Sequence, residues 1–287
     1  MREVTIEANG LTFRGYAMGA GPLALCLHGF PDSAHTWRHL LPALADAGFH
    51  AVAPFLRGYA PTSVPTDGCY ATGALVADVV ALHDALGGDA DAVLVGHDWG
   101  ALAAYAAGAF TPDRFRRLVT MAVPPPASTV HAFFTYDQLK RSFYTFLFQT
   151  PFAEMAVFAD EMAFLDGLWR DWSPGYDGTL DVERAKDCLR DPANLAAAIG
   201  YYRALFDPSR LDPRYAGEQA VAMATPPQPT LYLHGAADGC FVTLDVELVA
   251  AHLSPESRVE VFEGVGHFLH LERPRDVNAR VLAWLAA

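Results

Sequence analysis

The fold is decided by the stretch Gly96-His97-Asp98-Trp99-Gly100 and by what lies on either side of it. An apolar run over 92–95 precedes the stretch and is typical of a buried strand, whereas the alanine-rich run 99–110 is typical of a helix. Between them the chain must turn sharply, and the glycines before and after Asp98 leave room for backbone to approach backbone. The pattern predicts that Asp98 stands at the end of a strand and at the start of a helix.

Strand and helix signals alternate along much of the chain. The expected strands are 4–6, 11–17, 23–27, 50–53, 92–95, 118–122, 230–234 and 258–262, and the expected helices are 34–47, 71–86 and 99–110, with further helices beginning near 244 and 274. The first two strands are joined through Asn9-Gly10, a pair that favours a tight hairpin turn. Alternation at this spacing predicts an α/β fold with a mostly parallel, doubly wound sheet.

The alternation is interrupted once. Pro124-Pro125-Pro126 opens an aromatic-rich stretch without strand signals, and Pro226-Pro227 closes it. The simplest interpretation is a helical cap inserted into an α/β core between two proline-marked hinges. We therefore predict a core made of residues 1–123 and 226–287 and a cap, or lid, made of residues 124–225.

Composition limits the classes of partner. The formal net charge is −13 and no basic stripe is present, which argues against nucleic acid and favours a neutral or apolar small molecule. The four cysteines lack metal-ligand spacing and are typical of buried thiols in a reducing compartment. Because we find neither a signal-peptide pattern nor an apolar run of bilayer length, we expect a cytoplasmic protein without a membrane partner. The excess of arginine over lysine favours a bacterial source.

Asp98 determines the chemistry that this turn implies. A carboxylate has a reference pKa of about 4, so it is ionised at neutral pH and can attack carbon without the help of a base. Attack on an sp³ carbon leaves an ester on the enzyme, which water must then hydrolyse. The residue type therefore points to opening an epoxide or displacing a halide, and away from ordinary ester cleavage. The structural alternative is a glycine-bounded turn with a capping aspartate.

The hydrolytic water needs a general base, and eleven histidines are candidates. His267 is the best placed, because it follows Gly264-Val265-Gly266 directly after the last expected strand. That loop lies at the carboxyl edge of the predicted sheet. We expect His97 to pack away from the turn, and His252 and His270 to be structural or exposed.

A histidine base needs an acid that orients it. Asp238 follows the expected strand 230–234 and so lies at the same edge of the sheet, whereas Asp245 fits a surface or helix-terminal charge better. The order Asp98, Asp238, His267 resembles the nucleophile–acid–histidine order of the α/β-hydrolase superfamily. This resemblance extends over nearly the whole chain and implies an α/β-hydrolase fold.

Within that superfamily the chain looks most like the epoxide hydrolases. The matching residues are His28-Gly29-Phe30-Pro31, Arg57-Gly58-Tyr59, Gly96-His97-Asp98-Trp99-Gly100, and the strand-end residues Asp238 and His267. The resemblance implies an oxyanion hole built from the backbone N–H groups of Phe30 and Trp99. Such chemistry needs no metal and no organic cofactor.

The resemblance further implies two cap tyrosines that hold the epoxide oxygen and protonate it as the ring opens. Tyr144 and Tyr202 lie in segments similar to the tyrosine segments of that family. A phenol, with a reference pKa of about 10, is a suitable acid for an alkoxide, which is far more basic. The cap offers four rivals, namely Tyr136, Tyr176, Tyr201 and Tyr215.

Alternative functions remain open at this point. A haloalkane dehalogenase would share the turn, the base and its acid, and would need a second N–H donor for the halide. The Phe30 side chain cannot supply one, but Trp169 or Trp172 could. Fluoroacetate dehalogenases usually carry Arg where Trp99 stands, and a non-catalytic ligand-binding relative is disfavoured because every catalytic position is filled. The expected partners are a small apolar or neutral epoxide and water, for a monomer or homodimer.

Overall fold

One eight-stranded sheet runs through the protein, whose computed structural model describes residues 1–287. The strands are β1 (Arg2–Ala8), β2 (Leu11–Met18), β3 (Leu23–Leu27), β4 (His50–Pro54), β5 (Val93–His97), β6 (Arg117–Met121), β7 (Thr230–Gly235) and β8 (Arg258–Phe262). Their order is β1-β2-β4-β3-β5-β6-β7-β8, and only the pairs β1·β2 and β2·β4 are antiparallel. The predicted mostly parallel α/β sheet is confirmed.

The first two strands form the predicted hairpin. Ala8 pairs with Leu11, so Asn9 and Gly10 form the turn, with φ values of 46° and 71°. Positive φ at both central residues gives a turn whose twist matches that of the flanking strands, and Asn-Gly is the pair that best tolerates it.

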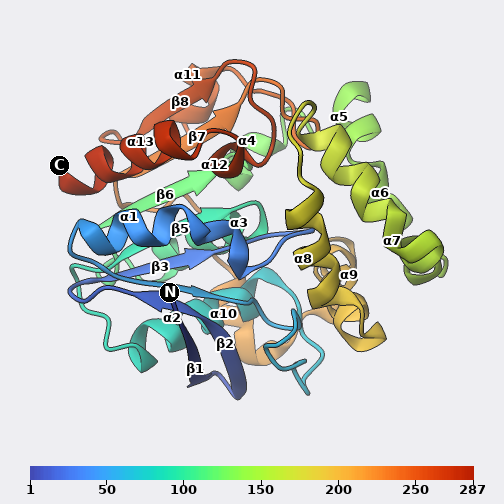
Figure 1. Ribbon diagram of the computed structural model, residues 1–287, viewed down its shortest axis with the longest axis horizontal. Helices are drawn as coiled ribbons and strands as arrows, with labels where there is room; N and C mark the ends of the chain where they lie inside the picture. The colour runs from blue at the N-terminus through green and yellow to red at the C-terminus, as the bar shows by residue number, and fades with distance from the viewer.

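Helices cover both faces of the sheet (Figure 1). They are the 3₁₀ helix η1 (Ala34–Arg38) and the helices α1 (Leu40–Asp46), α2 (Thr72–Ala85), α3 (Trp99–Phe110), α11 (Val246–Ala250), α12 (Leu269–Glu272) and α13 (Pro274–Ala286). α1 contacts α13 on one face, and α2 contacts α3 on the other. Every residue of β3 and β5 is buried, as expected for central parallel strands covered on both sides.

Two helices differ from the sequence prediction. The helix expected over 34–47 is divided at His39 into η1 and α1. Pro42 has no N–H group and would interrupt one continuous helix, whereas the first turn of α1 tolerates it. The helix expected from about 244 is the short α11, and Asp245 caps it by accepting two backbone N–H groups.

Between β6 and β7, all of the regular secondary structure is helical. This helical segment consists of α4 (Pro126–Thr129), α5 (Tyr136–Arg141), α6 (Phe143–Leu147), α7 (Ala153–Trp172), α8 (Thr179–Leu189), α9 (Pro192–Phe206), η2 (Pro208–Arg210), η3 (Pro213–Tyr215) and α10 (Ala216–Gln219). Figure 1 shows α5 to α9 beyond the ends toward which the arrows of β3 and β6 point. One cluster of buried hydrophobic residues extends from the sheet into these helices. None of the helices combines the length and the apolar composition that crossing a bilayer requires.

Candidate active site

The turn at Asp98 has the predicted geometry. Asp98 lies between β5 and α3 with φ 53° and ψ −117°, a conformation that costs a non-glycine residue on the order of 1–3 kcal/mol. A Cβ at Gly96 would collide with the backbone of Gly100, and a Cβ at Gly100 would collide with the carbonyl of Leu27. The two glycines therefore allow β3, β5 and α3 to close around the turn.

The backbone N–H of Phe30 holds the Asp98 carboxylate. Its Oδ1 accepts the N–H of Phe30 at 2.7 Å, and a Cβ at Gly29 would collide with the carboxylate. Burial raises the pKa of Asp98 above its usual value, while His267 and the N–H groups of Phe30 and Trp99 oppose this rise. Of the two backbone donors expected from the sequence, Phe30 therefore forms a hydrogen bond with this carboxylate.

His267 and Asp238 meet on the loops that follow β8 and β7. His267 Nδ1 lies 2.9 Å from Asp238 Oδ2, and Asp238 Oδ1 accepts the N–H groups of Cys240 at 2.6 Å and Phe241 at 3.0 Å. An ionised carboxylate only accepts hydrogen bonds, so Nδ1 of His267 carries the hydrogen. His267 Nε2 has no hydrogen-bond partner and lies 3.8 Å from Oδ2 of Asp98.

The neighbouring charges set the protonation of this pair. Burial by itself would lower the pKa of His267, but the two nearby carboxylates, Asp238 above all, raise the pKa above its usual value. Burial would likewise raise the pKa of Asp238, but the interaction with His267 outweighs this effect. The pKa of Asp238 therefore lies below its usual value. Asp238 is therefore ionised at neutral pH, and His267 has an increased affinity for a proton.

Tyr144 on α6 and Tyr202 on α9 come together from the helical segment. Their ring centroids lie 5.4 Å apart, and the Tyr202 ring packs 5.3 Å from Phe30 and 5.2 Å from Trp99. The buried hydroxyl of Tyr202 has no partner, whereas that of Tyr144 lies 3.5 Å from Sγ of Cys240. Burial raises the pKa of both phenols well above its usual value, and the Asp98 charge adds to the rise, so both phenols are protonated at neutral pH.

The four rival tyrosines are engaged elsewhere or exposed. Tyr201 donates to the carbonyl of Arg57, and Tyr176 and Tyr215 donate to aspartates, while Tyr136 is 80 % exposed. Among the tyrosines of the helical segment, the predicted pair combines burial with hydroxyls that have no oxygen partner.

Known proteins with similar sequences identify the family. Residues 22–274 match the family model of the alpha/beta hydrolase fold. "Epoxide hydrolase A" of Mycobacterium tuberculosis is 31% identical to this chain over 99% of this chain and 97% of that protein. An "Epoxide hydrolase" of Caballeronia sordidicola is 30% identical over 99% and 94%, respectively. The chain belongs to the epoxide hydrolases.

Solved structures of epoxide hydrolases have the same fold. Epoxide hydrolase A from Mycobacterium thermoresistibile is similar with a TM-score of 0.82 and 27% identity, over 100% of this chain and 98% of that one. An epoxide hydrolase from Vigna radiata is similar with a TM-score of 0.80 and 27% identity, over 99% and 98%.

The site of this epoxide hydrolase also includes two side chains that were not expected there from the sequence. Trp172, considered only as a halide donor, packs 5.1 Å from Tyr144 and 5.0 Å from His267 between ring centroids. Cys240 contacts the hydroxyl of Tyr144. The position of Cys240 directly after the Asp238 turn was a usable signal, whereas Trp172 comes from the distant end of α7 and no spacing rule selects it.

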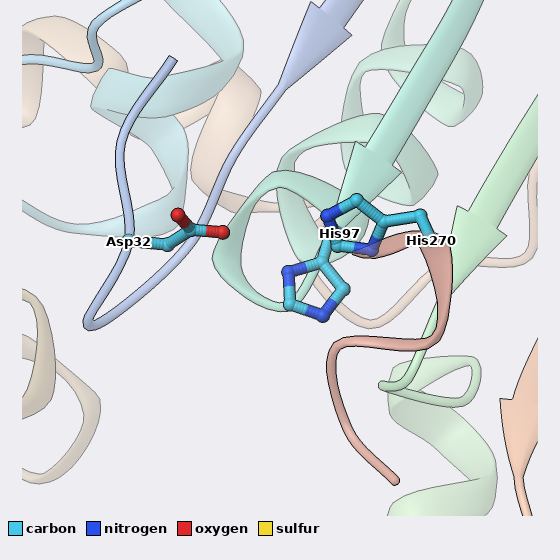
Figure 2. A group of neighbouring side chains, drawn as sticks. All are labelled: Asp32, His97 and His270. Atoms are coloured by element: carbon cyan, nitrogen blue, oxygen red, sulfur yellow. The ribbon is translucent and has the colours of Figure 1, made fainter. Parts of the chain in front are cut away.

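A layer of buried polar side chains lies behind the site of the epoxide hydrolase. Figure 2 shows Asp32, His97 and His270 gathered together. His97 Nε2 donates to the carbonyl of His267 at 3.0 Å, and His270 Nε2 is hydrogen-bonded to Thr36. Burial lowers the pKa of both His97 and His270 well below the usual value and raises the pKa of Asp32 to about 8. His97 therefore supports the backbone of the predicted base and has the packing role expected of it.

An apolar cavity of about 380 Å³ adjoins the site at Trp99. Its wall includes Leu102 of α3, Leu205 of α9, and the loop residues Met223 and Phe241. Asp98 does not line this cavity and is only 5% exposed. The epoxide hydrolase thus has a sheltered polar site beside a space suited to an apolar group.

Proposed function

We propose that this chain hydrolyses epoxides to vicinal diols through a covalent ester on Asp98. The proposal rests on one observation: a carboxylate, an imidazole and two phenols lie together in one buried site. A carboxylate held by the backbone N–H of Phe30 faces the free Nε2 of a histidine oriented by Asp238, and two protonated phenols pack above it. These groups suffice for both halves of the reaction.

In the first half, an oxygen of Asp98 attacks a ring carbon of the epoxide. Oδ2 is the better candidate, because Oδ1 is already hydrogen-bonded to Phe30. The ring C–O bond breaks as the new C–O ester bond forms, and Tyr202 or Tyr144 gives its proton to the epoxide oxygen. A high phenol pKa does not prevent this transfer, because an alkoxide is more basic still.

In the second half, water attacks the carbonyl carbon of the Asp98 ester. His267 Nε2 removes a proton from that water, and Asp238 stabilises the imidazolium that forms. The oxyanion develops on Oδ1, where the N–H groups of Phe30 and Trp99 can donate to it. The tetrahedral intermediate then collapses, the proton on His267 passes to the departing alkoxide, and the diol is released. The second proton of the attacking water, left on the Asp98 carboxyl, passes to the tyrosinate, which restores both groups for the next cycle.

The dehalogenase alternative receives less support from the side chains. A halide leaving group needs N–H donors, and the indole N–H of Trp169 already donates to the carbonyl of Pro31 at 2.8 Å. Trp172 remains as a donor for that alternative. The buried hydroxyls of Tyr144 and Tyr202 suit an epoxide oxygen, which must be protonated, better than a halide, which need not be.

The cap belongs to the same proposal. We assign residues 1–123 and 226–287 to the α/β-hydrolase core and residues 124–225 to a cap, because both tyrosines come from helices of this insertion. The substrate is a small apolar or neutral epoxide, in keeping with the apolar cavity beside Trp99. Four unpaired, buried cysteines are in keeping with an enzyme of the reducing cytoplasm. A bacterial source and a monomeric or homodimeric state complete the proposal.

The proposal is tested by trapping the ester. His267→Gln should permit the first half and block the second, so intact-mass spectrometry after exposure to styrene oxide should detect a gain of the whole epoxide mass. Asp98→Ala, exposed in parallel, should gain nothing. Exposure to 1-chlorohexane distinguishes the dehalogenase, which would instead gain the alkyl chain with loss of HCl. Normal turnover by His267→Gln would contradict the assignment of the base.

A further inference from the structure

The buried site contains a thiol that the proposed reaction does not use. Asp98, His267 and Cys240 each offer one ligand atom, and these three atoms lie within 4.8 Å of one another. Carboxylate oxygen, imidazole nitrogen and thiolate sulfur are the ligand types that zinc takes in proteins. All three side chains are buried, so they meet away from bulk solvent.

The histidine has the form and orientation of a metal ligand. His267 is fully buried, and its Nε2 has no hydrogen-bond partner. Its Nδ1 is fixed by Asp238 at 2.9 Å, and a carboxylate in this position is the usual support of a zinc-bound histidine. The nitrogen left free is therefore aligned toward Asp98 and Cys240.

Asp98 and His267 need to move little to bind one ion. Oδ2 of Asp98 lies 3.8 Å from Nε2 of His267. Two such ligands bound tetrahedrally at about 2.0–2.1 Å would lie roughly 3.4 Å apart. A closure of a few tenths of an ångström would bring both atoms into range of one ion. Sγ of Cys240, which lies within 4.8 Å of both atoms, supplies the third ligand.

We propose that Asp98, Cys240 and His267 form a binding site for a thiophilic divalent cation such as Zn²⁺, and that the bound ion blocks the enzyme reversibly. One carboxylate and one thiolate neutralise the charge of the ion, and His267 binds as the neutral imidazole. The S–H bond of Cys240 breaks, its proton passes to solvent, and a sulfur–metal bond forms without any change of oxidation state. The blocked enzyme has lost both its nucleophile and its base; this consequence rests on the proposed function, whereas the binding does not.

The test measures ion binding directly. Metal-free wild type, Cys240→Ala and Cys69→Ala are titrated calorimetrically with Zn²⁺, and with Co²⁺ while the sulfur-to-cobalt charge-transfer absorption is recorded. Cys69 is the matched control, because it is a buried thiol outside the site. We expect one ion per chain for wild type and Cys69→Ala. For Cys240→Ala, we expect an affinity at least ~100-fold lower and no charge-transfer band.

Inhibition provides a second readout. Zn²⁺ should inhibit turnover of styrene oxide by wild type and Cys69→Ala, a chelator should restore it, and Cys240→Ala should require far more Zn²⁺. If Cys240→Ala does not fold, Cys240→Val takes its place. Equal Zn²⁺ affinity in wild type and the Cys240 variant would overturn the proposal, since an ion held at Asp32, His97 and His270 or at the surface survives this change. If wild type binds Zn²⁺ as expected but does not turn over styrene oxide, the proposed function is contradicted and the proposed metal site is not.

Discussion

At the scale of single residues, the two oxygens of Asp98 have different neighbours. Oδ1 accepts the N–H of Phe30, and Oδ2 faces Nε2 of His267. The two tyrosines also differ, since the Tyr202 hydroxyl is unpartnered and the Tyr144 hydroxyl contacts Cys240. Each group thus has a distinct role in the proposed cycle, and substitutions that remove a single group can test that role.

Removing a tyrosine hydroxyl should slow ring opening. Tyr202→Phe and Tyr144→Phe should each reduce the single-turnover rate of ester formation about 10²-fold, and the double variant more, because a positioned acid contributes on that order. The rate is measured by rapid quenching and intact-mass spectrometry. Tyr201→Phe is the control, because its hydroxyl donates to Arg57 and should not affect ring opening. An unchanged rate in the double variant would exclude the tyrosines as acids.

Asp32 should make the protein less stable as the pH rises. Burial raises its pKa to about 8, whereas the unfolded carboxyl has a pKa of about 4. The native state therefore keeps a proton that the unfolded state loses, and stability falls between about pH 4 and pH 8. Asp32→Asn does not titrate. The free energy of unfolding of this variant minus that of wild type, measured by urea denaturation, should therefore increase as the pH is raised from about 4 to 8. A difference from wild type that does not vary with pH would refute this role.

At the scale of elements, the site depends on where the strands end. Asp98, Asp238 and His267 follow β5, β7 and β8, and parallel neighbouring strands bring their carboxyl ends to one edge of the sheet. The turn at Asp98 between β5 and α3, here called the elbow, depends in addition on the absence of side chains at Gly96 and Gly100.

Adding a methyl group to the elbow should destabilise the fold. The Cβ of Gly100→Ala would meet the backbone of Leu27 in β3, which cannot move aside as a flexible side chain could. We expect a loss of roughly 1–3 kcal/mol in the free energy of unfolding, measured by urea denaturation. Gly167→Ala in α7 is the matched control, because its added Cβ meets only ordinary contacts. Equal effects of the two changes would show that the close approach at the elbow is unimportant.

At the scale of the whole molecule, much of the fold followed from local patterns. The apolar runs predicted the strands that carry Asp98, Asp238 and His267, and the division of the helix over 34–47 could have been predicted from Pro42. The tyrosine positions came from family resemblance. Their packing against one another, and that of Trp172 against His267, depends on how distant helices pack over the sheet, which no residue spacing encodes.

The core and the helical segment should unfold together. One hydrophobic cluster includes Leu25 of β3 as well as Trp172 and Tyr201 of the helical segment. Unfolding followed by far-UV circular dichroism and by tryptophan fluorescence should therefore give coincident transitions. Two separated transitions would contradict a core shared between the sheet and the helical segment.

The central claim is that the new oxygen of the diol comes from Asp98, and single turnover in water enriched in a heavy oxygen isotope tests it most directly. With enzyme in excess over styrene oxide, the first diol released should carry ordinary oxygen from Oδ2 of Asp98. The heavy oxygen should appear in the peptide that contains Asp98, as mass spectrometry of the digested enzyme would detect. Heavy oxygen in the first diol, with none in that peptide, would mean that water attacks the epoxide directly and would contradict the covalent mechanism.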